Sequence, residues 1–220
     1  MRTVFQQTVN CQNKYIMNTG NYRMSFTTGG LFHHESVQLA QLFLDLGDWN
    51  LVRNKVIAEN VLQTRTLSTL KRVCREVVSR LQMLSSIELE FFVEASHQEQ
   101  AYLLWLAICR QYRFIADFAV EVLQERYISL KADLTYDDFD SFFNRKSEWH
   151  LELEKITPAT RGKLRQVLFK ILREADLITT SNTIHAAMLS PALVQLIHQG
   201  DSREILYFPV FESNLKRTTR

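Results

Sequence analysis

The chain has 220 residues, of which 46% are hydrophobic and 23% charged, and its formal net charge is only +2. This length and apolar content are enough for a substantial core in one or two compact domains, and they argue against a disordered chain. Six glycines and three prolines are too few for the many turns of an all-β protein, so we expect a mainly α fold.

The number and spacing of cysteines and the hydropathy of the chain indicate in which cellular compartment the protein is found. Cys11, Cys74 and Cys109 are odd in number and widely spaced, which suggests neither a disulfide framework nor a zinc site. We expect them to be buried or incidental thiols in a reducing compartment. The longest strongly apolar run, residues 102–109, is far shorter than the roughly 20 residues of a membrane-spanning helix. The N-terminus lacks the apolar stretch of a secretory signal, so the expected location is cytoplasmic, with no membrane contact.

The pattern along the chain predicts four parts. Residues 1–24 form a polar N-terminal extension with alternative starts at Met17 and Met24. Residues 25–84 form a helix-turn-helix-like unit, and residues 85–154 form an acidic helical core. Residues 155–220 form a winged-helix-like unit with a short β-hairpin.

Three helices are expected in the first folded unit. A turn at residues 27–30 precedes a helical apolar repeat that stops at Gly47, and Asp48 is a suitable N-cap for a second helix. The third helix, residues 66–82, is strongly amphipathic. Its predicted inner face consists of Leu67, Leu70, Val73, Cys74, Val77, Val78 and Leu81, and its outer face of Arg65, Ser68, Arg72, Arg75 and Ser79. A cationic third helix is typical of helix-turn-helix units, although a solvated basic surface helix has the same pattern.

The middle of the chain should hold the core. Ser85 and Glu88 have capping-box spacing, and residues 97–130 are apolar on nearly every side, as in a buried central helix or helix pair. Thr135 then starts a helix with acidic residues in its first turn. The predicted core side of that helix is Phe139, Phe142 and Phe143.

The C-terminal part begins with Thr157 as N-cap and Pro158 at the first helical position. This helix should point Lys163, Gln166, Lys170 and Arg173 outward. Two β-prone pieces, residues 177–180 and 183–184, flank a turn and predict a hairpin wing, with which a strand at residues 205–208 could pair. Between them, a short helix should run from Ser190-Pro191 to Gly200.

The charges are segregated along the chain. Residues 49–80 carry seven basic and two acidic residues (+5), and residues 155–173 carry six basic residues and no acid. The intervening residues 85–154 carry fourteen acids and six bases (−8). Two cationic surfaces of this kind attract phosphate backbones, so a polyanion is the expected partner. If each block uses about three or four residues, the logarithmic salt slope should be about −5 to −7.

The sequence contains none of the common motifs of enzyme active sites. No phosphate-binding glycine loop, zinc-protease helix, nucleophile elbow or dinucleotide fingerprint occurs. His33 and His34 point in different directions on a helix and are expected at the surface, and Asp137, Asp138 and Asp140 are explained by helix capping. His150 and Glu154 should form an ordinary surface pair. We therefore expect no enzyme activity, cofactor, metal or small-molecule substrate.

Double-stranded DNA is the expected ligand. The candidate contact residues are Arg65, Ser68, Lys71, Arg72, Arg75, Arg80, Lys163, Gln166, Lys170 and Arg173. Two alternatives stay open. The acidic middle and apolar surface residues could recruit protein partners as an adaptor, and a phosphate-driven surface cannot by itself distinguish duplex DNA from structured RNA.

Four strings of residues also resemble a known family. They are YRMSFTTGGLF at 22–32, LKR at 70–72, EQAYLLWLA at 99–107 and RFIADFA at 113–119. In order and content they resemble the BrxA family of the BREX bacteriophage-exclusion systems, with further similarity through residues 136–149 and near Ser190. The resemblance implies a mostly helical, non-catalytic, cytoplasmic DNA-binding accessory protein that acts with a methyltransferase and other BREX components. It supplies no catalytic residues, and residues 1–21 are additional to the family pattern.

Overall fold

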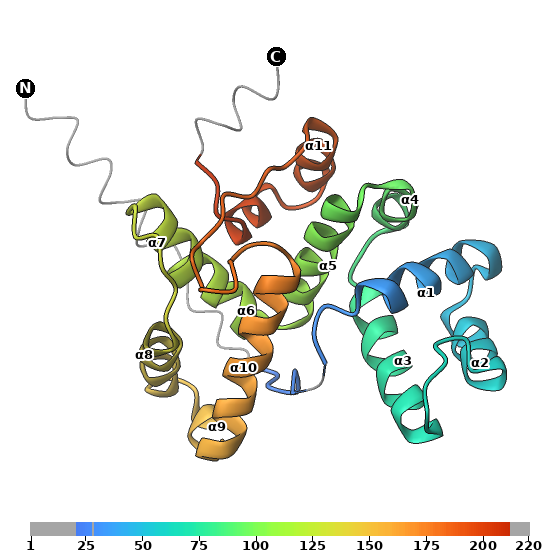
Figure 1. Cartoon of the computed structure of the whole chain (residues 1–220), viewed down its shortest axis with the longest axis horizontal. Coiled ribbons are helices and arrows are strands. Elements are labelled where there is room, and N and C mark those ends of the chain that lie inside the picture. The colour runs from blue at the N-terminus through green and yellow to red at the C-terminus, as the bar shows by residue number, and fades with distance from the viewer. Residues whose placement is uncertain (1–20, 28, 212–220) are drawn as a thin grey trace, which may run out of the picture.

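The computed structural model describes residues 21–27 and 29–211 and is mainly helical (Figure 1). The first part contains α1 (His33–Leu46), α2 (Trp49–Glu59), α3 (Leu67–Leu81) and α4 (Ser86–Glu94). The centre contains α5 (His97–Gln111), α6 (Arg113–Phe118), the π-helix η1 (Ala119–Gln124) and α7 (Glu125–Ile128). The remainder contains α8 (Tyr136–Ser147), α9 (Leu151–Glu154), α10 (Pro158–Glu174), α11 (Pro191–Gln199) and the 3-10 helix η2 (Ser202–Tyr207).

Local capping signals set many helix ends. Gly47 ends α1 in the left-handed region with φ 69°, and the Asp48 carboxylate accepts hydrogen bonds from two amides of α2. Ser85 with Glu88, and Thr135 with Asp138, form reciprocal capping boxes. These predicted boundaries are confirmed.

The three predicted N-terminal helices are present and pack on one another. The link between α2 and α3 spans residues 60–66, longer than the roughly three or four residues of a helix-turn-helix turn. The helix-turn-helix assignment therefore stays a prediction. Part of the turn expected at residues 27–30 lies outside the described residues, because Thr28 is not described.

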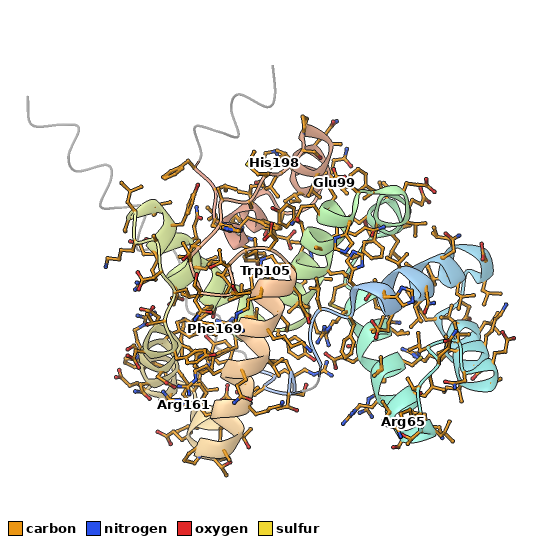
Figure 2. The ribbon with its side chains drawn as sticks, in the orientation of Figure 1. Arg65, Glu99, Trp105, Arg161, Phe169 and His198 are labelled. Atoms are coloured by element: carbon orange, nitrogen blue, oxygen red, sulfur yellow. The ribbon has the colours of Figure 1, made fainter. Side chains whose placement is uncertain are left out.

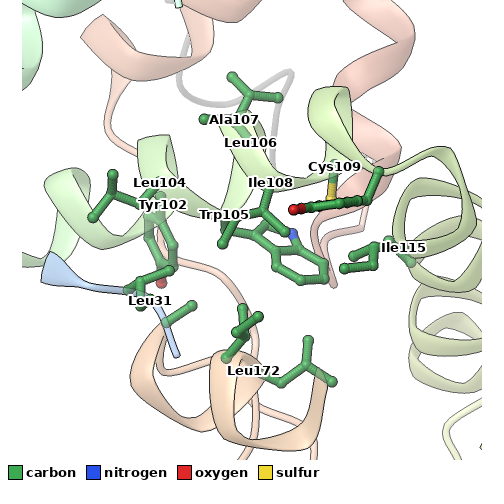
Figure 3. Packing of buried hydrophobic residues seen from close by; sticks show 14 of the residues in the cluster. Leu31, Tyr102, Leu104, Trp105, Leu106, Ala107, Ile108, Cys109, Ile115 and Leu172 are labelled. Carbon is green, nitrogen blue, oxygen red and sulfur yellow. The ribbon is translucent and has the colours of Figure 1, made fainter. Parts of the chain in front are cut away.

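Helix α5 is the centre of the core, as its all-round apolar sequence predicts. Every residue from 100 to 109 is buried, and Figure 3 shows this helix packed between side chains from several other elements. Its polar groups find partners, as buried polar groups must. The Trp105 indole donates to the Tyr207 carbonyl at 2.9 Å, and the Gln100 amide donates to the Phe92 carbonyl at 3.0 Å.

A charged cluster closes the end of α5. The Arg110 guanidinium donates to Glu88 of α4 at 2.8 Å and to Glu204 of η2 at 2.7 Å. Both carboxylates are largely buried, with side chains 5% and 10% exposed. One arginine therefore pairs with two acids and ties the first and last parts of the described fold to the central helix.

The winged-helix details are not confirmed. Backbone pairing in the described residues is limited to isolated bridges, Ile178 with Ile184 and Asp133 with Thr183, so the expected β-hairpin does not form strands. The two pieces still share backbone hydrogen bonds, from the Thr179 amide to the Thr183 carbonyl at 2.8 Å and from the His185 amide to the Leu177 carbonyl at 2.9 Å. The Ile184 amide donates to the Ala132 carbonyl at 2.6 Å. The strand expected at residues 205–208 is wrong, because most of it lies in η2. The flanking α10 and α11, with Thr157 and Ser190 as N-caps, are confirmed.

The folded part begins before residue 25. Tyr22 is only 4% exposed, and its hydroxyl donates to Asp117 at 2.6 Å while its ring packs edge-on against Phe114. Phe26 is fully buried beside Tyr112. The last residues assigned to a polar extension are therefore part of the core, and residues 1–20 lie outside the described residues.

Cys74 and Cys109 are buried free thiols, as expected, whereas Cys11 lies outside the described residues. No helix within the described ranges is both long enough and apolar enough to cross a membrane.

Replacing Arg110 with Met should lower the free energy of unfolding by about 3 kcal/mol, because Glu88 and Glu204 would be left buried without a cation. Urea unfolding measures this. Arg203→Met is the matched control, since that side chain is 82% exposed and pairs with Asp201 at the surface, and the expected change is below about 1 kcal/mol. Equal losses in both variants would contradict the role of the cluster.

Acid should weaken the same cluster. Burial acts to raise the pKa of Glu88, but hydrogen bonds from Arg110 and Ser85, together with the charge of Arg110, bring that pKa below its usual value. A carboxyl with a lowered folded pKa stabilises the fold above its unfolded pKa, and this contribution is lost as pH falls through the folded pKa. The free energy of unfolding should therefore decrease below about pH 4.5. Glu88→Gln should flatten that decrease, which urea titrations at several pH values would measure.

Candidate nucleic-acid interface

Helix α3 presents a cationic outer face to solvent. The exposed residues on or just before it are Arg65, Ser68, Lys71, Arg72 and Arg75. Thr66 caps the helix by accepting a hydrogen bond from the Thr69 amide at 3.2 Å, which fixes where the first turn begins. Figure 2 shows Arg65 at this end of α3, at the edge of the molecule. Leu67, predicted on the inner face, is instead 55% exposed.

The cations on this face are not paired with acids of the described part of the chain. Among the residues that the structure describes, no carboxylate lies within 4.0 Å of the charged groups of Arg65, Lys71, Arg72 or Arg75. Their positive charges are therefore available to a ligand in solution. A mobile exposed arginine or lysine loses little when it exchanges water for a phosphate, and each contact releases condensed counterions.

Arg80 is the exception on α3, and its prediction as a contact residue is wrong. The side chain is 1% exposed and pairs with Glu76 at 2.9 Å. It donates to the Gly30 carbonyl at 2.6 Å and lies over the Phe32 ring at 5.4 Å. The position of Arg80 on α3 directs its side chain toward the core. Arg80 therefore stabilises the fold and cannot contact a polyanion.

The second basic helix, α10, is much less available than its sequence suggests. Lys163 and Gln166 are exposed, and no ion pair or side-chain hydrogen bond is found for either within the described ranges. Lys170 is exposed but lies 3.5 Å from Glu174. Arg173 is half-buried and donates to the Asn182 side chain at 2.7 Å. Of the four predicted contacts on α10, Lys170 and Arg173 are engaged by other residues, whereas Lys163 and Gln166 have no such partner in residues 21–27 and 29–211.

Asp140 of α8 neutralises two further arginines of this block. Arg161 pairs with Asp140 at 2.8 Å, and Arg165 forms a second ion pair with the same carboxylate. Each guanidinium also lies over an aromatic ring, Phe143 for Arg161 and Tyr136 for Arg165. The acid that balances the block comes from a different helix, which a count of charges within residues 155–173 cannot detect.

Residues 30 and 31 connect the two basic helices, which lie on either side of the N-terminal segment in Figure 1. The Gly30 carbonyl accepts from Arg80 at the end of α3, and the Leu31 amide donates to Glu174 at the end of α10 at 2.5 Å. A Cβ at Gly30 would lie 2.2 Å from the Glu174 carboxylate, so a side chain at this position would displace Glu174 from its hydrogen bond with the Leu31 amide. This junction sets how α3 and α10 are placed relative to each other.

A cavity lies at the same junction, lined in part by His33, His97 and Lys170. His33 is half-buried and stacks on His97 with ring centroids 4.0 Å apart, so it is not the surface histidine expected from the sequence. Burial, and then the proximity of His97, lower the pKa of His33. Among the described residues, no group of three or more His, Cys, Asp or Glu side chains could hold a metal ion.

Arg23 is a further surface cation. It was not among the predicted contacts, because it lies in the segment assigned to a polar extension. It is exposed and lies over the Tyr112 ring at 5.8 Å. The Tyr112 hydroxyl in turn donates to Glu76 of α3 at 2.7 Å, which places Arg23 close to the basic helix.

The fold and this surface define an all-helical protein with one strongly cationic helix face. The family model BrxA matches residues 20–201, so the chain belongs to the BrxA family. The BREX protein BrxA of Escherichia coli O9:H4 (strain HS) is 27% identical over 183 residues, which cover 81% of this chain and 86% of that protein. The BREX protein BrxA of Paramagnetospirillum magneticum (strain ATCC 700264 / AMB-1) is 21% identical over 187 residues, covering 84% and 94%. A crystal structure of an uncharacterized protein from Magnetospirillum magneticum superposes with a TM-score of 0.74 at 18% identity, covering 86% of this chain and 97% of that one, which supports the fold.

The different roles of Arg80 and Arg75 can be separated by stability. Arg80→Met should lower the free energy of unfolding by about 3 kcal/mol, because it leaves the Glu76 carboxylate without its cation and the Gly30 carbonyl without the Arg80 donor. Arg75→Met, five residues earlier on the same helix, should change it by less than about 0.5 kcal/mol. Urea unfolding of both variants checks this, and a large loss from Arg75→Met would show that this side chain is not a free surface cation.

Proposed function

We propose that this chain is a non-catalytic, duplex-DNA-binding component of a BREX phage-defence system. Membership of the BrxA family and the names of its relatives support the assignment to BREX. The observation that carries the DNA-binding part is the set of four exposed cations along the outer face of α3 for which the described part of the chain supplies no carboxylate. Helix α3 contributes most of the binding, and α10 contributes less because most of its cations are already engaged.

The chemistry of the α3 face suits phosphates. Arg72 and Arg75 lie on one stripe of the helix, about one turn apart, and Lys71 and Arg65 extend the charge toward its N-terminal end. The exposed Ser68 hydroxyl adds a hydrogen-bond donor in the first turn, where the helix dipole also favours an anion. Phosphate contacts of this kind fix position on a duplex and carry little sequence information. We therefore infer mainly non-specific binding.

The engaged cations lower the expected salt dependence. With about four or five phosphate contacts, from α3 and Lys163, the slope of log affinity against log salt should be about −4. This is smaller in magnitude than the value expected when both basic blocks were counted as free.

The proposal that the chain is not an enzyme depends on what its charged residues do in the fold. Of the three acids of the Asp137–Asp140 cluster, Asp138 caps α8 and Asp140 binds two arginines, which leaves Asp137 alone without a structural partner in the described residues. The engaged carboxylates are poorly suited to holding a metal ion for hydrolysis.

Charge reversal on α3 tests the proposed interface. The double variant Arg72→Glu, Arg75→Glu should weaken binding to duplex DNA by about tenfold or more at low salt, and should reduce the magnitude of the salt slope by about 2. The loss should be similar for unrelated DNA sequences. Fluorescence anisotropy against salt concentration measures both quantities.

The matched control is Lys131→Glu, which changes an exposed lysine beyond α7 and should leave DNA affinity nearly unchanged at physiological salt. Unchanged affinity in the α3 variant would overturn the assignment of this face. Competition between duplex DNA and structured RNA at matched salt tests the choice of nucleic acid, and tighter RNA binding would replace DNA as the ligand.

A further inference from the structure

A second surface with a different chemistry lies at the corner between α8 and α9. Trp149 and Leu151 are 73% and 69% exposed, although tryptophan and leucine normally bury most of their surface. Figure 1 shows α9 beside the start of α10, on the side away from α3. This corner is therefore separate from the cationic face of α3, which contributes most of the proposed DNA binding.

The backbone explains why both side chains point outward. His150 between them has an extended conformation, with φ −130° and ψ 92°, so its neighbours project to the side opposite its own ring. The His150 ring points inward and packs on the Tyr22 ring with centroids 4.1 Å apart. Turning His150 into the fold therefore turns Trp149 and Leu151 out of it.

The corner is held firmly. Nδ1 of His150 lies 3.2 Å from the Glu152 carboxylate, and that carboxylate accepts from the Tyr22 amide at 2.6 Å. Leu153, the next apolar residue, is 1% exposed and anchors α9 to the core. The pairing of His150 with Glu152 also corrects the expected surface pair with Glu154. An apolar pair on a fixed backbone loses little conformational entropy when a partner binds.

The charge around the corner is negative. Residues 148–155 carry Glu148, Glu152 and Glu154 against Lys155, a net charge of −2. Glu148 and Glu154 are exposed, and no ion pair is found for either within the described part of the chain. Two free carboxylates beside an aromatic side chain repel a phosphate backbone and attract lysine and arginine.

We propose that the Trp149–Leu151 corner is a docking surface for a protein partner that presents apolar side chains flanked by lysine or arginine. A central tryptophan with charged surroundings is typical of the few residues that supply most of the binding energy at protein interfaces. The acidic surroundings select a basic partner and disfavour nucleic acid. The protein thus has two surfaces of opposite charge, one for a polyanion and one for a basic polypeptide.

Short peptides test this chemistry with the full-length chain. A labelled peptide of alternating Leu and Lys should bind more tightly than one of alternating Leu and Glu, as measured by fluorescence anisotropy. Trp149→Ala should weaken binding of the Leu-Lys peptide by about tenfold or more. Glu148→Gln combined with Glu154→Gln should also weaken it and reduce its salt dependence.

Leu130→Ala is the matched control, because Leu130 is 81% exposed beyond α7 and should not affect peptide binding. Circular dichroism would confirm that every variant is folded. Three results would overturn the proposal. The first is peptide binding that is independent of Trp149. The second is loss of duplex-DNA affinity in Trp149→Ala, which would make the corner a base contact. The third is dissociation of an oligomer of this chain by Trp149→Ala in sedimentation experiments, which would make the occupant a second copy.

Discussion

The burial of every residue from 100 to 109 of α5 is the constraint on which the rest of the structure depends. A helix that is apolar on all sides must be covered on all sides, so the chain has to place other elements around it. Its indole, amide and guanidinium groups then need partners, since an unpaired polar group in the core costs about 1–3 kcal/mol. The Trp105 indole donates a hydrogen bond to the Tyr207 carbonyl, and Arg110 forms ion pairs with both Glu88 and Glu204. The polar requirements of one buried helix thereby fix where α4 and η2 must lie.

The same principle divides the cations of the chain into two populations. Arginines that point toward the core or toward neighbouring helices are matched by carboxylates, as Arg80 is by Glu76 and Arg161 by Asp140. Arginines on the outer face of α3 have no such match within the described residues. An unpaired exposed cation contributes nothing to stability, so its presence is better explained by a ligand or by solubility. Because four of them lie on one helix face, a ligand is the stronger explanation.

Features set by neighbouring residues could be predicted from the sequence. The N-caps Asp48, Ser85 and Thr135, the stop at Gly47 and the buried character of α5 all follow from short-range patterns, and the structure confirms them. The ion pair between Glu76 and Arg80 could also have been predicted, because the two residues have i,i+4 spacing on one helix. That spacing is the signal that would have removed Arg80 from the candidate contacts.

Features set by distant residues could not be predicted. The β-prone residues 205–208 satisfy the strand pattern, yet tertiary packing places most of them in a 3-10 helix against α5 and α11. Asp140 lies more than twenty positions from Arg165, and nothing local indicates that α8 supplies the acid for α10. Charge segregation along the sequence therefore exaggerated the second basic surface.

Many acidic residues in the middle of the chain, residues 85–154, have defined partners in the structure. Most of its carboxylates are engaged: Asp117 and Glu121 bind Lys146, Asp138 binds Arg126, and Asp140 binds two arginines. The pairs with Lys146 and Arg126 join residues within 85–154 and are already counted in the sequence total of −8, so only Asp140, which pairs with Arg161 and Arg165 of α10, offsets part of that excess. Glu148 and Glu154 differ because they have no ion pair in the described residues and flank an exposed tryptophan. Glu90, Glu94 and Asp137 are also exposed without an ion pair in the described residues. What distinguishes Glu148 and Glu154 is therefore their place beside two exposed apolar side chains, which indicates a surface maintained for binding.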